Sequence, residues 1–381
     1  MRIGVPREIK DGERRVGMTP YGVGRLVGAG HAVVVEANAG RAVGFSDTDF
    51  AAAGARIVSE PAEAWSAEVV AKVKEVQPRE YALLAPSSLV LCYAQLNRDA
   101  ALTDAVLRAR VRILAYENVR ADDGTLPLLS PMSRIAGRLA PLIAAQLLAS
   151  ADGAGVLMTG VDAVAPARVL VVGAGTVAIE AARIAARIGC EVGVFSRGAT
   201  RLRALAQALS AAGTPVQTAR IDDSPARFAD AVAEADVVIG AVRDPGKLSP
   251  KLISHDMLAR MRAGSVLIDV GIDQGGISQA SRQTVLSAPA FVASGVVHYC
   301  VPNMPALVAR TATFALTAAT LPCIERLANL GVERAVADDP GLAAGIMVWD
   351  GAVVHAGLAS DCRLPLQRPP WVSRPELLRT R

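Results

Sequence analysis

Short apolar runs alternate with segments of helical periodicity along the first 130 residues of the chain. Nearly continuous Val/Ile/Leu runs are typical of strands buried in a parallel sheet. Such runs lie at 2–6, 31–36, 69–75, 88–94 and 111–117, and helical patterns lie between them at 19–30, 49–58 and 99–110. This alternation predicts a doubly wound α/β sheet, which binds its ligands beyond the carboxyl ends of the strands.

A second alternating block occupies the middle of the chain, between two long helical patterns at 132–151 and 306–328. Its predicted strands lie at 168–175, 191–196, 215–221, 235–242, 265–271 and 291–299. We therefore predict two Rossmann-like domains. A dinucleotide-binding domain at 131–304 is inserted into a discontinuous substrate domain made of 1–130 and 305–381. The Pro/Arg-rich end, 360–381, is predicted to form a surface arm or tail.

Composition narrows the class of protein. The chain has 381 residues, of which 52% are hydrophobic and 20% charged, and a formal net charge of +4. Without a basic run, nucleic acid is not an expected partner. The five cysteines form no CxxC pair and only four histidines are present, so we predict no metal site. No signal peptide is evident, and charged residues interrupt the apolar run at 305–330. These features favour a cytoplasmic protein with no membrane span.

The sequence GAGTVA follows the predicted strand at 168–175 and opens a helical pattern. Gly173 permits the tight turn, and Gly175 lets the backbone approach a pyrophosphate. Ala178 keeps the helix close to the strand, and the helix N-terminus favours bound negative charge. This context predicts a dinucleotide site, and the alternative is that the small residues merely pack a helix against the sheet.

The next predicted strand ends at Ser196 and Arg197, where an acidic residue would hold both ribose hydroxyls of NAD. A serine cannot make that bidentate contact. Arg197, with Arg201 close behind, could instead pair with the 2′-phosphate of NADP, because a guanidinium offers a fork of donors. The pattern favours NADP (NADPH) over NAD, and the alternative is a solvated basic helix start.

Several longer motifs resemble alanine dehydrogenase and, more widely, the N-terminal part of proton-translocating transhydrogenase. They are MRIGVPREIKDGERRVGMTP, VVAKVKEVQP, LPLLSPMSRIAGRLA, VIGAVRDPGKLSPKLIS, SVLIDVGIDQGG and VHYCVPNMP, in order over about residues 1–350. The resemblance implies reduction of a 2-oxo acid plus ammonia, through an imine, to an amino acid. It also implies a nicotinamide cofactor held between two Rossmann-like domains, and a homo-oligomer, either a dimer or a hexamer.

The resemblance also implies particular site residues. Arg15 and Lys74 match the pair that holds the substrate carboxylate and carbonyl, with a surface charge and a solvated strand end as the respective alternatives. Asn303 would hydrogen-bond the nicotinamide or the substrate. Met132 and Ser133 would border the nicotinamide ring and the pyrophosphate.

The chain departs from the family pattern at two further positions near these residues. Gln95 in CYAQLNRD stands where the family has its acid–base histidine, and a glutamine cannot shuttle a proton at neutral pH. Arg134 stands where the family commonly has a glutamate. Asp273 in IDQGG is then the strongest proton-transfer candidate, with Tyr93 and Glu117 behind it. A turn-forming role is the alternative for Asp273.

These observations predict an NADP-dependent oxidoreductase that acts on the CH–NH or C=N bond of an amino or imino acid. Hydride delivery to a preformed imine needs less proton shuttling than building an imine from ammonia, so the substitution at Gln95 favours imine reduction. The alternative is a cofactor-binding protein that has lost dehydrogenase activity and serves as a sensor or non-redox enzyme. A transhydrogenase subunit is disfavoured, because membrane segments are missing and the cofactor choice differs.

Overall fold

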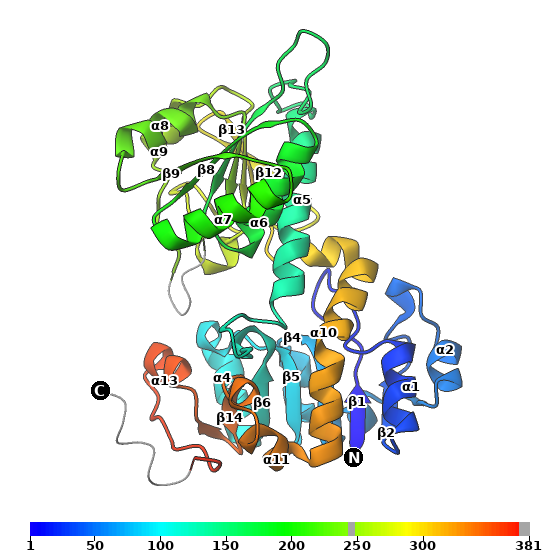
Figure 1. Ribbon diagram of the computed structural model, residues 1–381. Helices are drawn as coiled ribbons and strands as arrows, with labels where there is room; N and C mark the ends of the chain where they lie inside the picture. The colour runs from blue at the N-terminus through cyan, green and yellow to red at the C-terminus, as the bar shows by residue number, and fades with distance from the viewer. Residues whose placement is uncertain (243–247, 373–381) are drawn as a thin grey trace. The chain divides into compact units, whose positions relative to one another are not determined.

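The computed structural model describes residues 1–242 and 248–372 and divides into two compact units (Figure 1). Unit 1 comprises Met1–Met132 and Ala306–Arg381, and unit 2 comprises Ser133–Pro305. The predicted domain boundaries differ from these by one or two residues. Residues 243–247 of the VIGAVRDPGKLSPKLIS motif and residues 373–381 of the predicted arm lie outside the described residues.

The sheet of unit 1 has the order β15-β14-β6-β5-β4-β1-β2-β3. The strands are β1 (Arg2–Val5), β2 (Ala32–Glu36), β3 (Arg56–Val58), β4 (Val69–Lys74), β5 (Leu89–Tyr93), β6 (Arg112–Ala115), β14 (Ile346–Trp349) and β15 (Ala352–Val353). Strands β1 to β6 run parallel, and β14 and β15 add an antiparallel edge. The chain leaves β1 toward β2 and returns on its other side as β4. This reversal makes the β1–β4 boundary the topological switch point, where such folds bind ligands.

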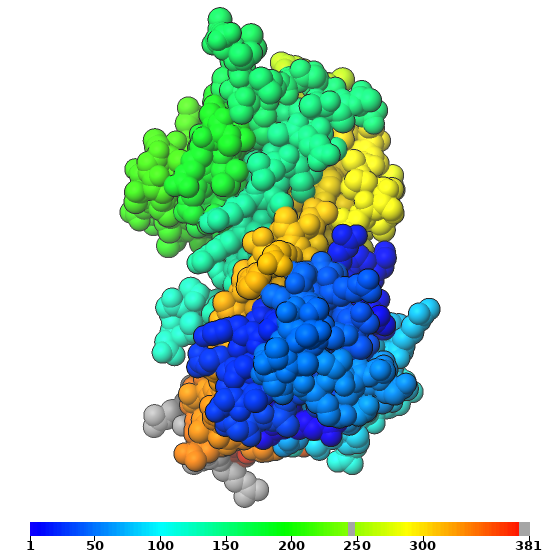
Figure 2. Space-filling view, turned by 90° about the vertical axis from the view of Figure 1, so that its right-hand side faces the viewer, coloured from blue at the N-terminus to red at the C-terminus, as the bar shows by residue number. Residues whose placement is uncertain are grey.

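Helices pack against both faces of this sheet because its central strands carry buried apolar side chains on both sides. They are α1 (Pro20–Gly28), α2 (Asp47–Ala52), α3 (Pro61–Trp65), α4 (Ala100–Ala109), α10 (Ala309–Leu330), α11 (Val332–Ala337), α12 (Pro340–Ala343) and α13 (Ala356–Cys362). Leu102 and Val106 of α4 join Trp65 of α3 against Val70, Val90 and Ile113 of the strands. Helices α1 and α10 contact each other, and their segments lie side by side on the surface (Figure 2).

Unit 2 repeats the doubly wound plan with the order β12-β13-β11-β10-β7-β8-β9. Its strands are β7 (Arg168–Val172), β8 (Glu191–Ser196), β9 (Gln217–Arg220), β10 (Val237–Gly240), β11 (Val266–Asp269), β12 (Ala290–Ala293) and β13 (Val296–Tyr299). Its helices are α5 (Ser130–Leu148), which begins in unit 1, α6 (Thr176–Arg187), α7 (Ala199–Ala211), α8 (Pro225–Glu234) and α9 (His255–Ala259). Figure 1 shows α6 and α7 on one face of the sheet and α8 and α9 on the other, each over its own apolar cluster. The switch point lies between β7 and β10.

The α/β class and the two doubly wound sheets are confirmed, but some predicted elements are wrong in detail. The segment 49–58, predicted as one helix, holds the end of α2 and then β3. The segment 291–299, predicted as one strand, is the antiparallel hairpin β12–β13, because Ser294 and Gly295 adopt φ angles of 51° and 75° and reverse the chain. Sheet-edge strands as short as these leave only a weak sequence pattern.

The C-terminal segments differ from the prediction in a similar way. The helix predicted at 306–328 begins as a 3₁₀ turn (Met304–Val308) before α10. The predicted arm begins inside α13, and the ring of Trp371 packs edge-on against Trp349 at 4.8 Å. The described part of the arm is therefore attached to the sheet edge of unit 1.

One helix in the described residues, Met304–Leu330, is long and apolar enough to cross a membrane by length and composition. Its buried side chains, which include Leu316, Ile324 and Leu327, pack within unit 1 beside α1 and α11. This matches the buried helix that the sequence predicted for the segment.

Candidate active site

Arg15 follows β1 at the switch point of unit 1 and is almost completely buried, with 2% of its surface exposed. Its Nε and Nη2 donate to the two carboxylate oxygens of Glu13 at 2.7 and 2.6 Å. Its Nη1 donates to the sulfur of Met132 at 3.0 Å. The surface-charge alternative is thereby excluded. Glu13 neutralises the buried guanidinium and fixes one of its edges.

Lys74 ends β4, directly opposite Tyr93 at the end of β5, after an irregularity in the strand register. Its side chain is 7% exposed and its Nζ lies 3.8 Å from Glu75 Oε2. Burial lowers the pKa of Lys74, and the nearby cations Lys10 and Arg15 act in the same direction while Glu75 opposes them. A desolvated ammonium ion next to Arg15 is suited to bind an anion and to give up a proton.

A buried ionic cluster that the sequence analysis missed supports Lys74. Lys72 Nζ donates to Glu8 Oε2 at 3.2 Å and to Glu80 Oε1 at 2.8 Å, and all three side chains are buried. Glu8 Oε1 also accepts from Val73 N at 2.6 Å, at the irregularity in β4. The only sequence signal was the lysine pair in AKVKE, which does not tell which lysine is paired internally.

Tyr93 and Gln95 lie at the end of β5 in the same unit. The Tyr93 hydroxyl donates to Leu128 O at 2.7 Å, and burial raises the pKa of Tyr93 well above its usual range. Gln95 is half-buried and adopts the left-handed conformation, with φ 47°. The Glu117 carboxylate accepts from Ala94 N at 3.3 Å and from Gln95 N at 3.1 Å. Burial raises the pKa of Glu117. Glu117 thus holds the turn that presents Gln95.

The glycine turn of unit 2 has the geometry of a dinucleotide site. Gly173 has φ +130°, and a Cβ there would lie 2.3 Å from Ala241 O, which follows β10 across the switch point. A Cβ at Gly175 would meet nothing within 4 Å, so the space beside the start of α6 is open. The N-cap residue of this helix is Gly175 itself, which has no side chain to cap the first N–H groups. Ala178 is fully buried. Uncapped N–H groups next to open space suit a pyrophosphate, so the residues present fit a nicotinamide dinucleotide.

The side chains that would choose between NAD and NADP end β8 and open α7. Ser196 is half-buried, and Arg197 and Arg201 are exposed. Among the described residues, the Arg197 guanidinium has no hydrogen-bonding or ionic partner. The end of β8 therefore carries an unpaired positive charge at the position where an NAD site has a carboxylate that binds the ribose hydroxyls.

The remaining predicted residues fall on both units. Met132 ends unit 1 and Ser133 begins unit 2, both within α5. Asp273 is half-buried in the 3₁₀ turn Ile272–Gln274 of unit 2. Asn303 is half-buried in unit 2 and adopts φ 63°. Each unit by itself therefore carries part of the predicted site.

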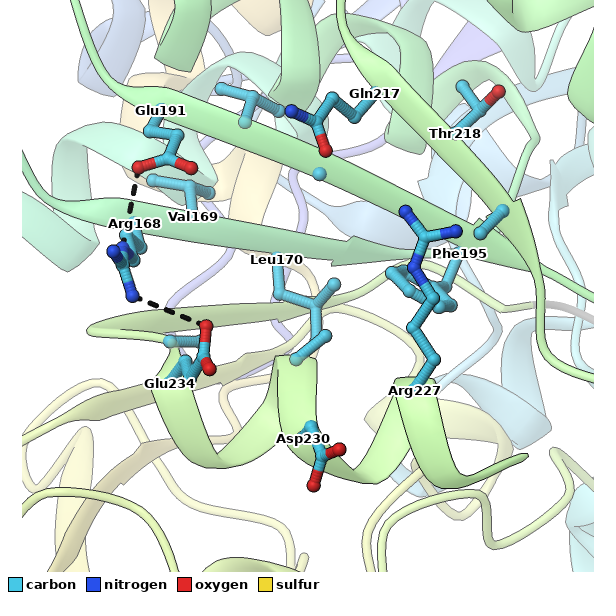
Figure 3. Close-up of a pocket in the computed structure, with 15 residues that line it drawn as sticks. Arg168, Val169, Leu170, Glu191, Phe195, Gln217, Thr218, Arg227, Asp230 and Glu234 are labelled. Carbon is cyan, nitrogen blue, oxygen red and sulfur yellow. Dashed lines mark hydrogen bonds and ion pairs between the residues drawn. The ribbon is translucent and has the colours of Figure 1, made fainter. Parts of the chain in front are cut away.

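A groove of about 260 Å³ lies on unit 2 between β7–β9 and α8. Figure 3 shows Arg168 at its margin, paired with Glu191 and Glu234 at 3.3 and 3.2 Å. The groove contains none of the predicted site residues. Over the described ranges, no group of His, Cys, Asp or Glu side chains is arranged to hold a metal ion.

Comparison with known proteins agrees with this geometry. The family described as "Alanine dehydrogenase/PNT, N-terminal domain" matches residues 4–136, and its C-terminal counterpart matches residues 140–356. The chain belongs to the alanine dehydrogenase/PNT family. It is an enzyme, an oxidoreductase of the amino-acid dehydrogenase type.

Individual members of the alanine dehydrogenase/PNT family resemble the chain over almost its whole length. An alanine dehydrogenase of Halomonas elongata is 46% identical over 361 residues, covering 94% of this chain and 96% of that protein. One of Bacillus subtilis is 41% identical, covering 95% and 94%. The solved structure of an L-alanine dehydrogenase superimposes with a TM-score of 0.89 at 41% identity, covering 95% and 99%. A transhydrogenase structure from Sinorhizobium meliloti, at 24% identity and a TM-score of 0.78, shares the fold.

Proposed function

We propose that the protein is an NADP-dependent oxidoreductase that forms an amino acid. It does so either by reducing the C=N bond of an imino acid or by reductive amination of a 2-oxo acid with an amine. The observation that carries this proposal is the pair of buried cations, Arg15 and Lys74, at the switch point of unit 1. The glycine turn of unit 2 and the alanine dehydrogenases among the relatives support it. Alanine is one member of the proposed product class.

Arg15 and Lys74 would perform the binding and polarisation steps. Glu13 occupies the Nε–Nη2 edge of Arg15, so a substrate carboxylate would approach the Nη1 side, where the Met132 sulfur is one acceptor. A thioether is a weak acceptor, and a carboxylate would displace it. Lys74, whose pKa burial lowers, would stabilise charge on the carbonyl or imine.

A bound nicotinamide dinucleotide would supply the hydride in the reductive direction. The chain's part is to hold the pyrophosphate at Gly173–Ala178 and the ribose end at Ser196 and Arg197. Asp273 and Asn303 are the proposed polar residues beside the reacting groups. We propose Asp273 as the proton-transfer group and Gln95 as a substrate-orienting amide. With no titratable group at Gln95, a preformed imine or a secondary amine is favoured over free ammonia.

Arg197 is the basis of the proposed NADP preference. Its free guanidinium and the lack of a carboxylate at Ser196 favour a 2′-phosphate over a 2′-hydroxyl. We further propose a cytoplasmic homo-oligomer, a dimer or a hexamer, whose subunit number can be measured by light scattering.

A spectrophotometric assay tests the activity. The purified protein is mixed with NADPH, and separately with NADH, and scanned against cyclic imino acids and against 2-oxo acids with ammonia or other amines. We expect NADPH oxidation, fastest with a preformed imine. Tight NADPH binding without oxidation by any substrate would instead support a protein that has lost dehydrogenase activity.

A further inference from the structure

Arg220 lies beside the proposed 2′-phosphate position, although it is 23 residues further along the chain than Arg197. It ends β9, the strand next to β8, and the register pairs it directly with Ser196. Ile221 N donates to Ser196 O at 3.1 Å, which fixes this pairing at the strand ends. Ser196, Arg197 and Arg220 therefore start from the same carboxyl edge of the sheet. The sequence alone did not indicate this, because the register of β9 brings Arg220 there.

The contacts of Arg220 join the β8–α7 turn to an acidic turn after β9. Its Nε donates to Arg197 O at 3.3 Å and its Nη1 donates to Asp223 Oδ1 at 2.7 Å. Its Nη2 lies 3.8 Å from Asp222 Oδ2, which is long for a hydrogen bond. The side chain is 37% exposed. The guanidinium is thus oriented by three partners, yet it still has donors and access to solvent.

We propose that Arg220 is a second specificity-determining residue, which binds the 2′-phosphate of NADP together with Arg197. This inference rests on the NADP preference proposed above. A 2′-phosphate carries close to two negative charges at neutral pH, more than one guanidinium neutralises. The guanidinium groups of Arg197 and Arg220, at the same strand edge, together offer the donors and the positive charge to bind it. NAD has no 2′-phosphate, so it cannot replace Asp223 as the partner of Arg220. In the absence of the phosphate, Asp223 holds Arg220 in place.

A purely structural role for Arg220 makes a different prediction. If Arg220 only held the β8–α7 turn against β9, its replacement would weaken the binding of NADPH and of NADH equally. Replacement of Asp223 would have the same effect. If Arg220 binds the phosphate, its loss weakens NADPH alone. Loss of Asp223 then removes a competing anion, so NADPH binds at least as tightly as before.

The test measures dissociation constants for NADPH and NADH by nicotinamide fluorescence, which requires no turnover. We expect Arg220→Gln to weaken NADPH about tenfold, the size of one partly exposed charge-assisted hydrogen bond, and to change NADH less than about twofold. Asp223→Asn is expected not to weaken NADPH. Equal weakening of both cofactors by Arg220→Gln, or no change in NADPH, would overturn the proposal.

A matched pair elsewhere on unit 2 controls for the loss of an arginine–aspartate contact. Arg260 Nη2 lies 2.7 Å from Asp230 Oδ1, and both side chains are exposed. Arg260 follows α9, ahead of the amino end of β11. Arg260→Gln and Asp230→Asn are expected to leave both dissociation constants unchanged. If Arg220→Gln lowers the melting temperature by several degrees, Arg220→Lys is used as the test variant instead. A lysine keeps the positive charge but lacks the forked donors of a guanidinium, so it should weaken NADPH binding to a smaller extent.

The same data separate this inference from the proposed NADP preference. If the wild-type protein binds NADH more tightly than NADPH, the NADP preference is wrong. If it prefers NADPH and Arg220→Gln leaves the ratio of the two constants unchanged, the preference stands and the role of Arg220 is wrong.

Discussion

Lys74 combines near-complete burial with a position at the end of a central strand. Its nearest carboxylate, Glu75, is 3.8 Å away and is shared with Lys10. A stabilising ion pair would have closer contacts, as Lys72 has with Glu8 and Glu80. The two lysines of AKVKE therefore differ in role. Lys72 is ion-paired inside the unit, whereas the buried charge of Lys74 is only weakly compensated and could be neutralised by an anionic substrate.

Replacing Lys74 by methionine should stabilise the protein while abolishing turnover. A pKa that burial lowers in the folded state means that the charged form costs stability at pH values below that pKa. The cost disappears as the pH rises from the lowered pKa to the ordinary value of 10.5. We expect Lys74→Met to raise the free energy of unfolding by about 1 kcal/mol at pH 7, and the gain to shrink toward pH 10. Chemical denaturation at several pH values measures it.

Lys10→Met is the matched control, because Lys10 pairs with the same Glu75 and is one-third exposed. It removes a favourable partner and should give no stabilisation. A Lys74→Met protein less stable than wild type at pH 7 would contradict the account of Lys74 as an uncompensated buried charge.

Gln95 is the residue at which proton transfer can be restored. Its left-handed backbone, held by Glu117, is a conformation that histidine also tolerates. We expect Gln95→His to increase ammonia-dependent reduction of 2-oxo acids by about tenfold or more, because a positioned general acid–base group contributes at least that much. Gln95→Asn, which cannot titrate, should give no increase. Equal rates in all three proteins would show that Gln95 does not limit the use of ammonia.

At the scale of the element, the two glycines of the β7–α6 turn have different predicted roles: Gly173 is needed for the fold and Gly175 for cofactor binding. Gly173→Ala should destabilise the protein by about 1–3 kcal/mol, because alanine is strained at φ +130° and its Cβ would strike Ala241 O. Gly175→Ala should leave the melting temperature unchanged, since φ is −92° and the space is open. It should nevertheless weaken both NADPH and NADH, because the methyl group occupies the space that a pyrophosphate needs. Thermal melts and fluorescence titrations measure the two effects, and a Gly175→Ala protein with normal cofactor affinity would contradict this account.

Most central elements could be predicted from the sequence because buried parallel strands are continuously apolar. Strands β1, β2, β4 to β8, β10 and β11 all follow such runs. Three strands of unit 1 were not predicted. β3 and β15 are three and two residues long, too short for a periodic signal, whereas β14 is as long as β1 and fully apolar but was not among the predicted strands. Some residues of the candidate site could likewise be predicted from the sequence and others could not. The resemblance assigns roles to Arg15 and Lys74, whereas the pairing of Glu8 and Glu13 with buried cations and the position of Arg220 follow only from burial and strand register.

At the scale of the whole molecule, the two units have the same strand order around their switch points. Each switch point carries a different chemistry. In unit 1 it holds the buried cations Arg15 and Lys74, and in unit 2 it holds the glycine turn. Repetition of one fold therefore gives a single chain the proposed anion-binding part and the proposed dinucleotide-binding part.

The central claim is that these parts together reduce a C=N bond with NADPH. The most direct measurement is the rate at which the wild-type protein oxidises NADPH and NADH with one cyclic imino acid, with Arg197→Asp measured beside it. We expect a higher kcat/KM with NADPH for the wild type and a shift toward NADH for Arg197→Asp. Oxidation of NADH in preference to NADPH by the wild type, or of neither cofactor, would contradict it.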